Sequence, residues 1–235
     1  MLTSKVLREH AETGKIVFGI NHVMRDFKTG RKKNLDLVIC TPKVPTISKT
    51  TLTSYSEANS ISLTPEERKV FDDLPVIRTG EVGSVLVAVE AKAVMTAHLK
   101  ALPRLHDELV SSHAVIHGAA EEAIAVGMVF INIAKMFSST DMNKFNLGSR
   151  ARVVSDNPQP NAAIRTVAKL LEIPRRTQPG TDGFDAFGIV LVDFENDGSS
   201  VDLAAAPLAI DLRGLDYTSM VHRIVAGYAS RFSNL

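Results

Sequence analysis

Two charged residues close a strand-like segment that is rich in valine. Residues 85–92 run Val-Leu-Val-Ala-Val-Glu-Ala-Lys. Because side chains alternate along a strand, Glu90 and Lys92 point to the same side. A charged pair at the end of an apolar strand is costly to bury, so this pattern favours a functional site over a purely structural one.

A second apolar segment, residues 35–40, carries a carboxylate at its beginning. Asp36 is followed by Leu-Val-Ile-Cys. If this strand and the valine-rich strand are antiparallel neighbours, the beginning of one lies beside the end of the other. Asp36 would then meet Glu90, with Lys92 next to them. Unlike the placement of Glu90 and Lys92, this depends on the topology of the sheet.

The three side chains together are suited to phosphodiester hydrolysis. Two carboxylates offer hard oxygen ligands to Mg²⁺, with Mn²⁺ as a substitute, and leave coordination positions for water and phosphate. A bound cation activates a water and neutralises charge on the phosphate oxygens. Lys92 would orient or deprotonate the attacking water, or stabilise the transition state.

Asp36 followed at a distance by Glu90-Ala91-Lys92 resembles the D…(E/D)-X-K signature of the PD-(D/E)XK nuclease superfamily. The order of an N-terminal helix, a hairpin bearing the aspartate, a strand ending in E-X-K, a helix and an apolar strand is similar as well. The resemblance covers roughly residues 1–135 and lies nearest to type II restriction endonucleases. One departure is Leu35, which stands where the family has proline.

This resemblance implies a Mg²⁺-dependent endonuclease that cuts double-stranded DNA, with Asp36, Glu90 and Lys92 as catalytic residues. Cutting at a palindrome implies a homodimer, since a two-fold site is matched by a two-fold protein. Three alternatives stay open: a repair or recombination nuclease, a ligand-activated defence nuclease, and an inactive nuclease-like fold that serves binding or assembly.

Further residues are candidates for the metal shell and for DNA contact. Glu9, on the N-terminal helix, is a candidate third metal ligand, as the resemblance implies. Basic residues near the two strands are candidates for gripping phosphates. The candidate DNA-binding residues are Lys28, Arg31, Lys32, Lys33, Lys100, Arg104 and His113. The His113–His117 spacing also permits zinc, a weaker interpretation because Ala114 replaces the glutamate of the zinc protease pattern.

Composition narrows the class of protein. The net charge is +1, so a nucleic-acid enzyme needs a local basic patch. The single cysteine, Cys40, cannot form a disulfide within the chain, which suits a reducing compartment. The charged N-terminus is unlike a signal peptide and no apolar run is long enough to span a bilayer. We therefore expect a cytoplasmic protein that does not enter a membrane.

Helical and strand patterns alternate along the 235 residues. They predict an α/β fold with a restriction endonuclease-like core, in which helices flank a mixed central sheet. We expect one domain over residues 1–235. Residues 1–135 would form the catalytic core, and residues 136–235 would complete it and supply dimer or DNA contacts. The Ser-, Thr- and Pro-rich stretch 42–62 predicts a long surface loop, and Thr64 predicts the beginning of a helix with a capping box.

Overall fold

The computed structural model describes residues 3–45, 48–144, 151–204 and 210–235. A mixed sheet of six strands forms its centre, with the spatial order β1-β2-β3-β4-β7-β8. Its strands are β1 (Val17–Arg25), β2 (Lys32–Pro42), β3 (Val82–Val94), β4 (Ile124–Asn132), β7 (Ala186–Asp193) and β8 (Asp202–Leu203). A separate two-stranded sheet pairs β5 (Met136–Phe137) with β6 (Ser155–Asp156).

Strand direction changes across the central sheet. β2 runs antiparallel to both β1 and β3, whereas β3, β4 and β7 are mutually parallel. The parallel strands consist of apolar residues almost throughout, as expected of strands that are covered on both faces. β7 belongs to the second part of the chain, and it extends the sheet beyond β4.

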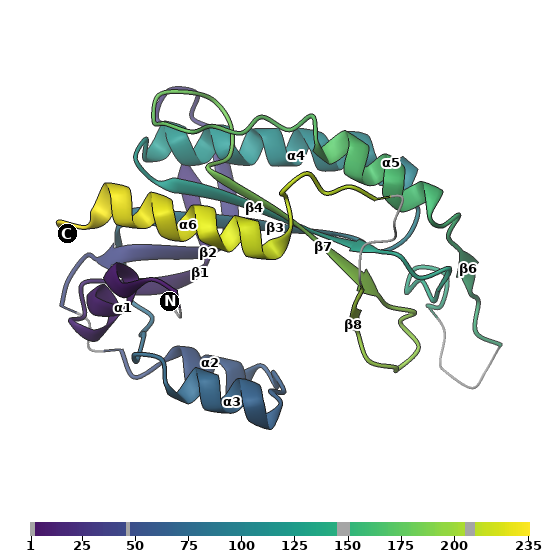
Figure 1. Cartoon of the computed structure of the whole chain (residues 1–235), viewed down its shortest axis with the longest axis horizontal. Coiled ribbons are helices and arrows are strands. Elements are labelled where there is room, and N and C mark those ends of the chain that lie inside the picture. The colour runs from purple at the N-terminus through teal and green to yellow at the C-terminus, as the bar shows by residue number, and fades with distance from the viewer. Residues whose placement is uncertain (1–2, 46–47, 145–150, 205–209) are drawn as a thin grey trace.

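Helices cover both faces of this sheet (Figure 1). Leu105 and Ala163, from α4 and α5, share one apolar cluster with one face of the sheet. Leu7 and Tyr228, from α1 and α6, share another cluster with the opposite face. The helices are α1 (Lys5–Glu12), α2 (Leu52–Ala58), α3 (Pro65–Asp72), α4 (His98–Ala119), α5 (Asn161–Leu170) and α6 (Tyr217–Phe232). The predicted α/β class with a mixed sheet flanked by helices is confirmed.

The β1–β2 hairpin leaves the plane of the sheet and reaches α4. Figure 1 shows it passing behind α4, with its loop emerging at the C-terminal end of that helix. There the N–H of Phe27 donates to the carbonyl of Gly118 over 3.3 Å. Asn21 takes a positive φ of 52° within β1, where the pairs Ile20–Leu37 and His22–Leu35 flank it. Asp36 lies opposite this irregular position.

Local predictions have mixed outcomes. The capping box is confirmed, because the Thr64 side chain accepts from the Glu67 N–H and the Glu67 carboxylate accepts from the Thr64 N–H. The expected long loop 42–62 is wrong in part. It contains the short helix α2, which begins with a second capping box between Thr51 and Ser54. Ser and Thr are unfavourable within helices but favourable as the residue that begins one. The Ser- and Thr-rich composition of this stretch therefore predicted a loop and did not indicate that Thr51 begins a helix.

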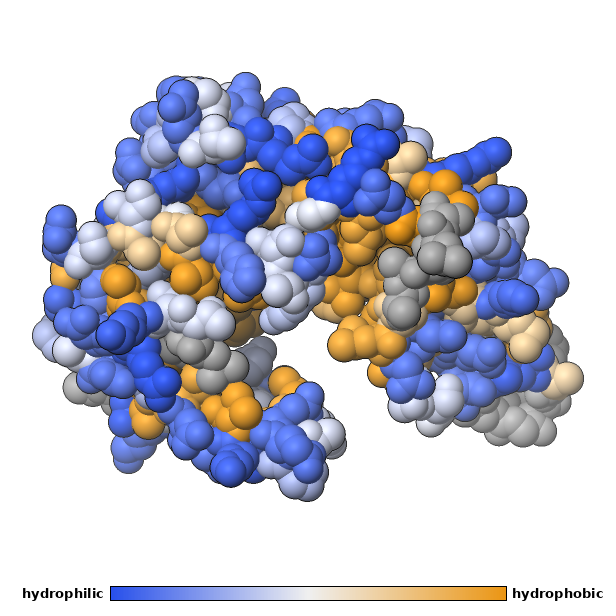
Figure 2. Space-filling view, viewed as in Figure 1, coloured by the Kyte–Doolittle hydropathy of each residue, from blue (hydrophilic) through white to orange (hydrophobic). Residues whose placement is uncertain are grey.

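The surface has a hydrophilic and an apolar region in the view of Figure 2. Hydrophilic residues cover much of α4, whereas apolar residues gather around β7 and β8. Val201 and Leu203 are 58% and 82% exposed there. The dimer or DNA contacts expected of residues 136–235 stay a prediction.

Within the described ranges, none of the helices combines the length and apolar character needed to cross a membrane.

Candidate active site

Glu90 and Lys92 project from β3 toward α4. Ala88 and Val94, which share their side of the strand, pack in the same apolar cluster as Leu105 of α4. The Lys92 ammonium lies 2.7 Å from Glu90 Oε1. Glu90 is only 2% exposed, whereas the Lys92 side chain is partly open. The pair that alternation placed on one side of a strand is therefore a direct, largely buried ion pair.

Asp36 joins this pair through the pairing of β2 with β3. The last antiparallel pair is Leu37 with Val89, so Asp36 and Glu90 come next on their strands. The Asp36 carboxylate is exposed, and its Oδ2 accepts a 2.6 Å hydrogen bond from the N–H of Ala91. The antiparallel neighbour relation expected from the sequence is confirmed. It brings Asp36 to the backbone between the other two residues.

Glu108 of α4 is a further member of the cluster, and the sequence analysis assigned it no role. Its Oε2 lies 3.6 Å from the Lys92 ammonium, and its Oε1 accepts from Arg104 Nε at 2.6 Å. The hydrogen bond from Arg104, helped by the charges of Lys92 and Lys33, lowers the pKa of Glu108 although burial opposes this. The Arg104–Glu108 spacing of four residues was a detectable signal for a helical ion pair. Which side of the helix faces β3 was not detectable.

The neighbouring carboxylates keep Lys92 in its charged form. Burial by itself lowers the pKa of Lys92, but Glu90, Glu108 and Asp36 outweigh it and raise that pKa. A lysine with a raised pKa keeps its proton at neutral pH. Of the roles expected from the sequence, those of a hydrogen-bond donor and a positive charge fit better than proton abstraction.

Glu90 offers one buried carboxylate oxygen that a divalent cation could bind. Glu90 Oε2 is buried, and within the described parts of the chain it finds no hydrogen-bond partner. A buried carboxylate oxygen without a partner is unfavourable, and a hard cation would satisfy it. Among the described residues, no group of three or more His, Cys, Asp or Glu could hold a metal ion.

A groove of about 620 Å³ begins beside Lys92 and runs along α4. Lys100 and Arg104 line it, and both are exposed. Lys33 reaches the same helix from the hairpin, where its ammonium donates to the Glu108 carbonyl over 3.3 Å. Three of the candidate DNA-binding cations thus gather around the groove.

The other three candidate cations, Lys28, Arg31 and Lys32, lie at the tip of the hairpin. They are exposed, and the tip packs at the C-terminal end of α4 rather than beside Lys92. Their contact with DNA stays a prediction, separate from that of the groove.

Glu9, which was expected to be a metal ligand, lies away from Glu90 and Asp36. It is exposed on α1, whose Leu7 and Ala11 pack against the face of the sheet that α6 covers. Glu90 points to the other face. The expectation of a third ligand from this helix is therefore wrong, because a side chain pattern within a helix does not reveal which face of a sheet the helix will cover.

The expected DNA contact of His113 is wrong as well. His113 is 3% exposed and packs edge-on against Phe184, with ring centroids 5.3 Å apart. Burial, with a smaller effect from His117, lowers the pKa of His113 to about 4. Its ring is therefore neutral at pH 7 and lies in the core, out of reach of a phosphate. The zinc interpretation also fails, because the ring of His117 contacts Asp185 instead.

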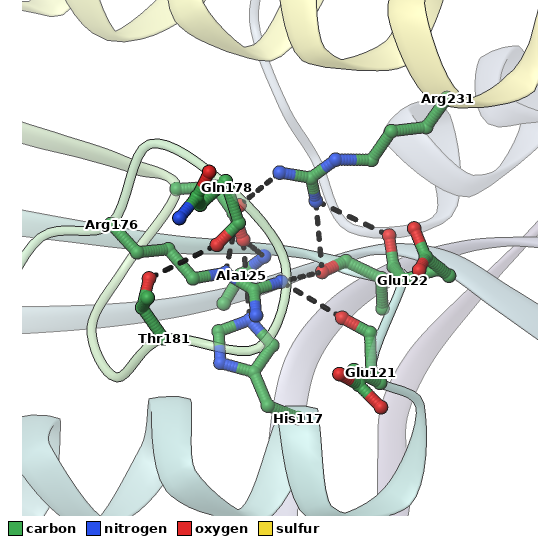
Figure 3. A network of polar contacts seen from close by, with 10 residues as sticks. His117, Glu121, Glu122, Ala125, Arg176, Gln178, Thr181 and Arg231 are labelled. Carbon is green, nitrogen blue, oxygen red and sulfur yellow. Dashed lines mark hydrogen bonds and ion pairs between the residues drawn. The ribbon is translucent and has the colours of Figure 1, made fainter.

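Figure 3 shows a second polar cluster, in which the side chains of His117, Arg176 and Arg231 converge. The carboxylate that joins them belongs to Asp185, the residue before β7. The carboxylate accepts from His117, from the N–H of Ala125, from Arg176 at 3.0 Å and from Arg231. Burial raises the pKa of Asp185, but these donors outweigh it and lower that pKa. Arg176 and Arg231 also donate to carbonyl groups before β4. Asp185 pairs with His117, Arg176 and Arg231, so the cluster fits a structural tie between α4, β4, β7 and α6.

Comparisons of the chain with protein-family models, with curated proteins and with solved structures found no match.

Proposed function

We propose that the protein is a metal-dependent endonuclease of the PD-(D/E)XK type, which hydrolyses phosphodiester bonds of double-stranded DNA. The observation that carries this proposal is the buried Glu90, whose Oε2 has no hydrogen-bond partner in the part of the chain that the structure describes, beside Asp36 and Lys92. The sequence order of these residues and the six-stranded mixed sheet support the same proposal.

Each residue has a distinct part in the proposed reaction. Asp36 and Glu90 would hold Mg²⁺, with Mn²⁺ as a substitute. A bound cation supplies a water of lowered pKa and neutralises charge on the phosphate oxygens. Lys92, which stays protonated, donates hydrogen bonds that orient the attacking water or stabilise negative charge on the phosphate.

The groove beside Lys92 supports a nucleic acid as substrate. Lys100 and Arg104 line the groove together with the acidic Glu108 and Asp141, and Lys33 reaches the Glu108 carbonyl beside it. Exposed cations along a groove can contact a phosphate backbone. Site-specific cutting of the type II restriction kind, by a homodimer on a palindrome, is the finer form of the proposal.

Plasmid cleavage tests the proposal. The protein is incubated with unmethylated plasmid and Mg²⁺, with Mn²⁺, and with EDTA. We expect cutting only with the cation. Discrete fragments would indicate restriction, whereas a smear would indicate a repair-type or other non-specific nuclease. A protein that cuts no form of DNA or RNA with either ion, but still binds DNA, would be an inactive nuclease-like binding protein.

The variant Lys92→Ala tests the site itself. We expect cleavage to fall by at least about 100-fold while DNA binding persists, because the lysine acts on the reaction more than on affinity. Lys100→Ala, in the same groove, is the comparison, and there binding should weaken more than the cleavage rate of bound DNA. Normal cutting by Lys92→Ala would show that the assigned site is wrong.

A further inference from the structure

The Lys92 ammonium is shared between carboxylates of two different elements. It lies 2.7 Å from Glu90 Oε1 on β3 and 3.6 Å from Glu108 Oε2 on α4. The contact with Glu90 is the shorter of the two. Glu108 is the second acceptor within reach of the same flexible side chain, and the side chains of Glu90 and Glu108 are 2% and 29% exposed.

The ion pair between Lys92 and Glu90 conflicts with the binding of a divalent cation at Glu90. An ammonium and a divalent cation on one carboxylate repel each other, the more so where the surroundings are partly buried. Glu90 Oε2 has no hydrogen-bond partner among the described residues, so it is the oxygen left for the cation, but Lys92 then needs a counter-charge further from that cation. Glu108 supplies that charge on the side of Lys92 that leads toward α4.

Arg104 competes with Lys92 for Glu108. Its Nε holds Glu108 Oε1 at 2.6 Å, while Oε2 of the same carboxylate faces Lys92. The Arg104 side chain is 86% exposed and lines the groove. A phosphate in the groove would offer Arg104 a stronger, bidentate partner than the single contact it makes with Glu108. Arg104 would then leave Glu108, and the full negative charge of the Glu108 carboxylate would be available to the Lys92 ammonium.

We propose that Glu108 is a positioning residue, which receives the Lys92 ammonium as a divalent cation occupies Glu90, and that Arg104 restrains this transfer until a phosphate engages it. The inference rests on the proposed function and names a residue outside the D…E-X-K signature. It predicts opposite effects for two neighbouring residues of α4. Loss of Glu108 should weaken cation binding, whereas loss of Arg104 should leave it unchanged or strengthen it.

Titration calorimetry of the DNA-free protein with MnCl₂ and with MgCl₂ measures this directly. For Glu108→Gln we expect the dissociation constant to rise roughly fivefold to tenfold. For Arg104→Ala we expect no rise, or a fall of roughly twofold. Glu108→Asp should recover part of the affinity, since it keeps the charge. Cleavage by Glu108→Gln should recover at saturating Mg²⁺, which a general loss of folding would not allow.

Glu12→Gln is the matched control, because Glu12 pairs with Arg8 at the same helical spacing but on α1. Its cation affinity should equal that of the wild type. The inference is overturned if Glu108→Gln binds the cation like the wild type, or if Arg104→Ala weakens binding as much as Glu108→Gln. Arg104→Ala removes an exposed side chain and so keeps the test valid if Glu108→Gln misfolds. A wild-type protein that binds neither ion would instead overturn the proposed function.

Discussion

The carboxylate of Asp36 accepts a hydrogen bond from the backbone N–H of Ala91, the residue that separates Glu90 from Lys92. This 2.6 Å contact follows the last pair of the β2–β3 ladder, and it replaces the backbone bond that a regular continuation would make there. Asp36 therefore has two separable properties. It accepts a hydrogen bond that holds the end of β3, and it carries a negative charge beside Lys92.

Asp36→Asn and Asp36→Ala separate these two properties. The asparagine keeps an oxygen that accepts from Ala91, so the free energy of unfolding should stay near that of the wild type. The alanine loses the acceptor and should be less stable by about 1 kcal/mol. Both remove the charge, and both should lose cleavage by at least about 100-fold. Urea denaturation and plasmid cleavage measure the two effects, and an active Asp36→Asn would exclude Asp36 as a metal ligand.

The groove cations should determine how DNA binding depends on salt. Each phosphate contact contributes about 0.9 to the slope of log affinity against log salt concentration. The double variant Lys100→Ala/Arg104→Ala should therefore lower the slope by about 2. Fluorescence anisotropy of a labelled duplex over a series of KCl concentrations measures it.

The hairpin tip provides the comparison. Lys28→Ala/Lys32→Ala removes the same amount of charge at the other end of α4, and we expect its slope to change by less than about 1. A larger effect at the tip than in the groove would place the DNA along the hairpin and contradict the groove as the binding surface.

Buried His113 should make the protein sensitive to acid. Its pKa falls from 6.5 to about 4 on folding, so below pH 6.5 the unfolded chain binds the proton more readily. The contribution of His113 to stability is complete above pH 6.5 and declines as the pH falls toward 4. The decline amounts to about 3 kcal/mol.

The variant His113→Leu should lose this part of the pH dependence. Urea denaturation at intervals between pH 7 and pH 4.5 compares the slopes of stability against pH. The exposed His222 serves as control, since His222→Leu should follow the wild-type slope. Parallel curves for wild type and His113→Leu would show that His113 takes up a proton as easily in the folded protein as in the unfolded chain.

Asp185 should be essential for stability rather than for catalysis. Asp185→Asn removes the only charge that balances Arg176, whose side chain is 1% exposed, among the contacts made by the described residues. Leaving one partner of a buried pair uncompensated costs about 3–5 kcal/mol. Thermal unfolding should show a large drop, whereas cleavage per folded molecule should be retained at low temperature. The exposed Asp182→Asn, from the same loop, should change neither.

Acid should weaken the same cluster in the wild type. The pKa of Asp185 is lower in the folded than in the unfolded protein, so its contribution is present above the ordinary aspartate pKa. It declines as the pH falls below that value. Asp185→Asn should therefore be less stable than the wild type at neutral pH, and the difference should narrow in strong acid.

Sequence reasoning was most successful where the chemistry is local. The alternation of side chains along β3 placed Glu90 and Lys92 together, and they form an ion pair. The capping box at Thr64 needed only four consecutive residues. Asp36 was harder, because its place depends on which strands pair, and the antiparallel β2–β3 ladder supplied the answer.

Tertiary packing decided the remaining members of the site. Leu105 and Leu109 bury one side of α4 against the sheet, and this rotation points Glu108 toward Lys92 while it buries His113. The layer in which α1 packs removed Glu9 from the site.

By itself, then, the sequence determined the chemical types of the site and the two residues that share one side of β3, because strand geometry is set by the local backbone. The three-dimensional structure decided which helix faces that side, which carboxylates share the Lys92 charge, and which basic residues reach the groove. These features depend on contacts between segments that are distant in the sequence. The sequence pattern of a single helix does not fix them, because the same pattern is compatible with several ways of packing that helix.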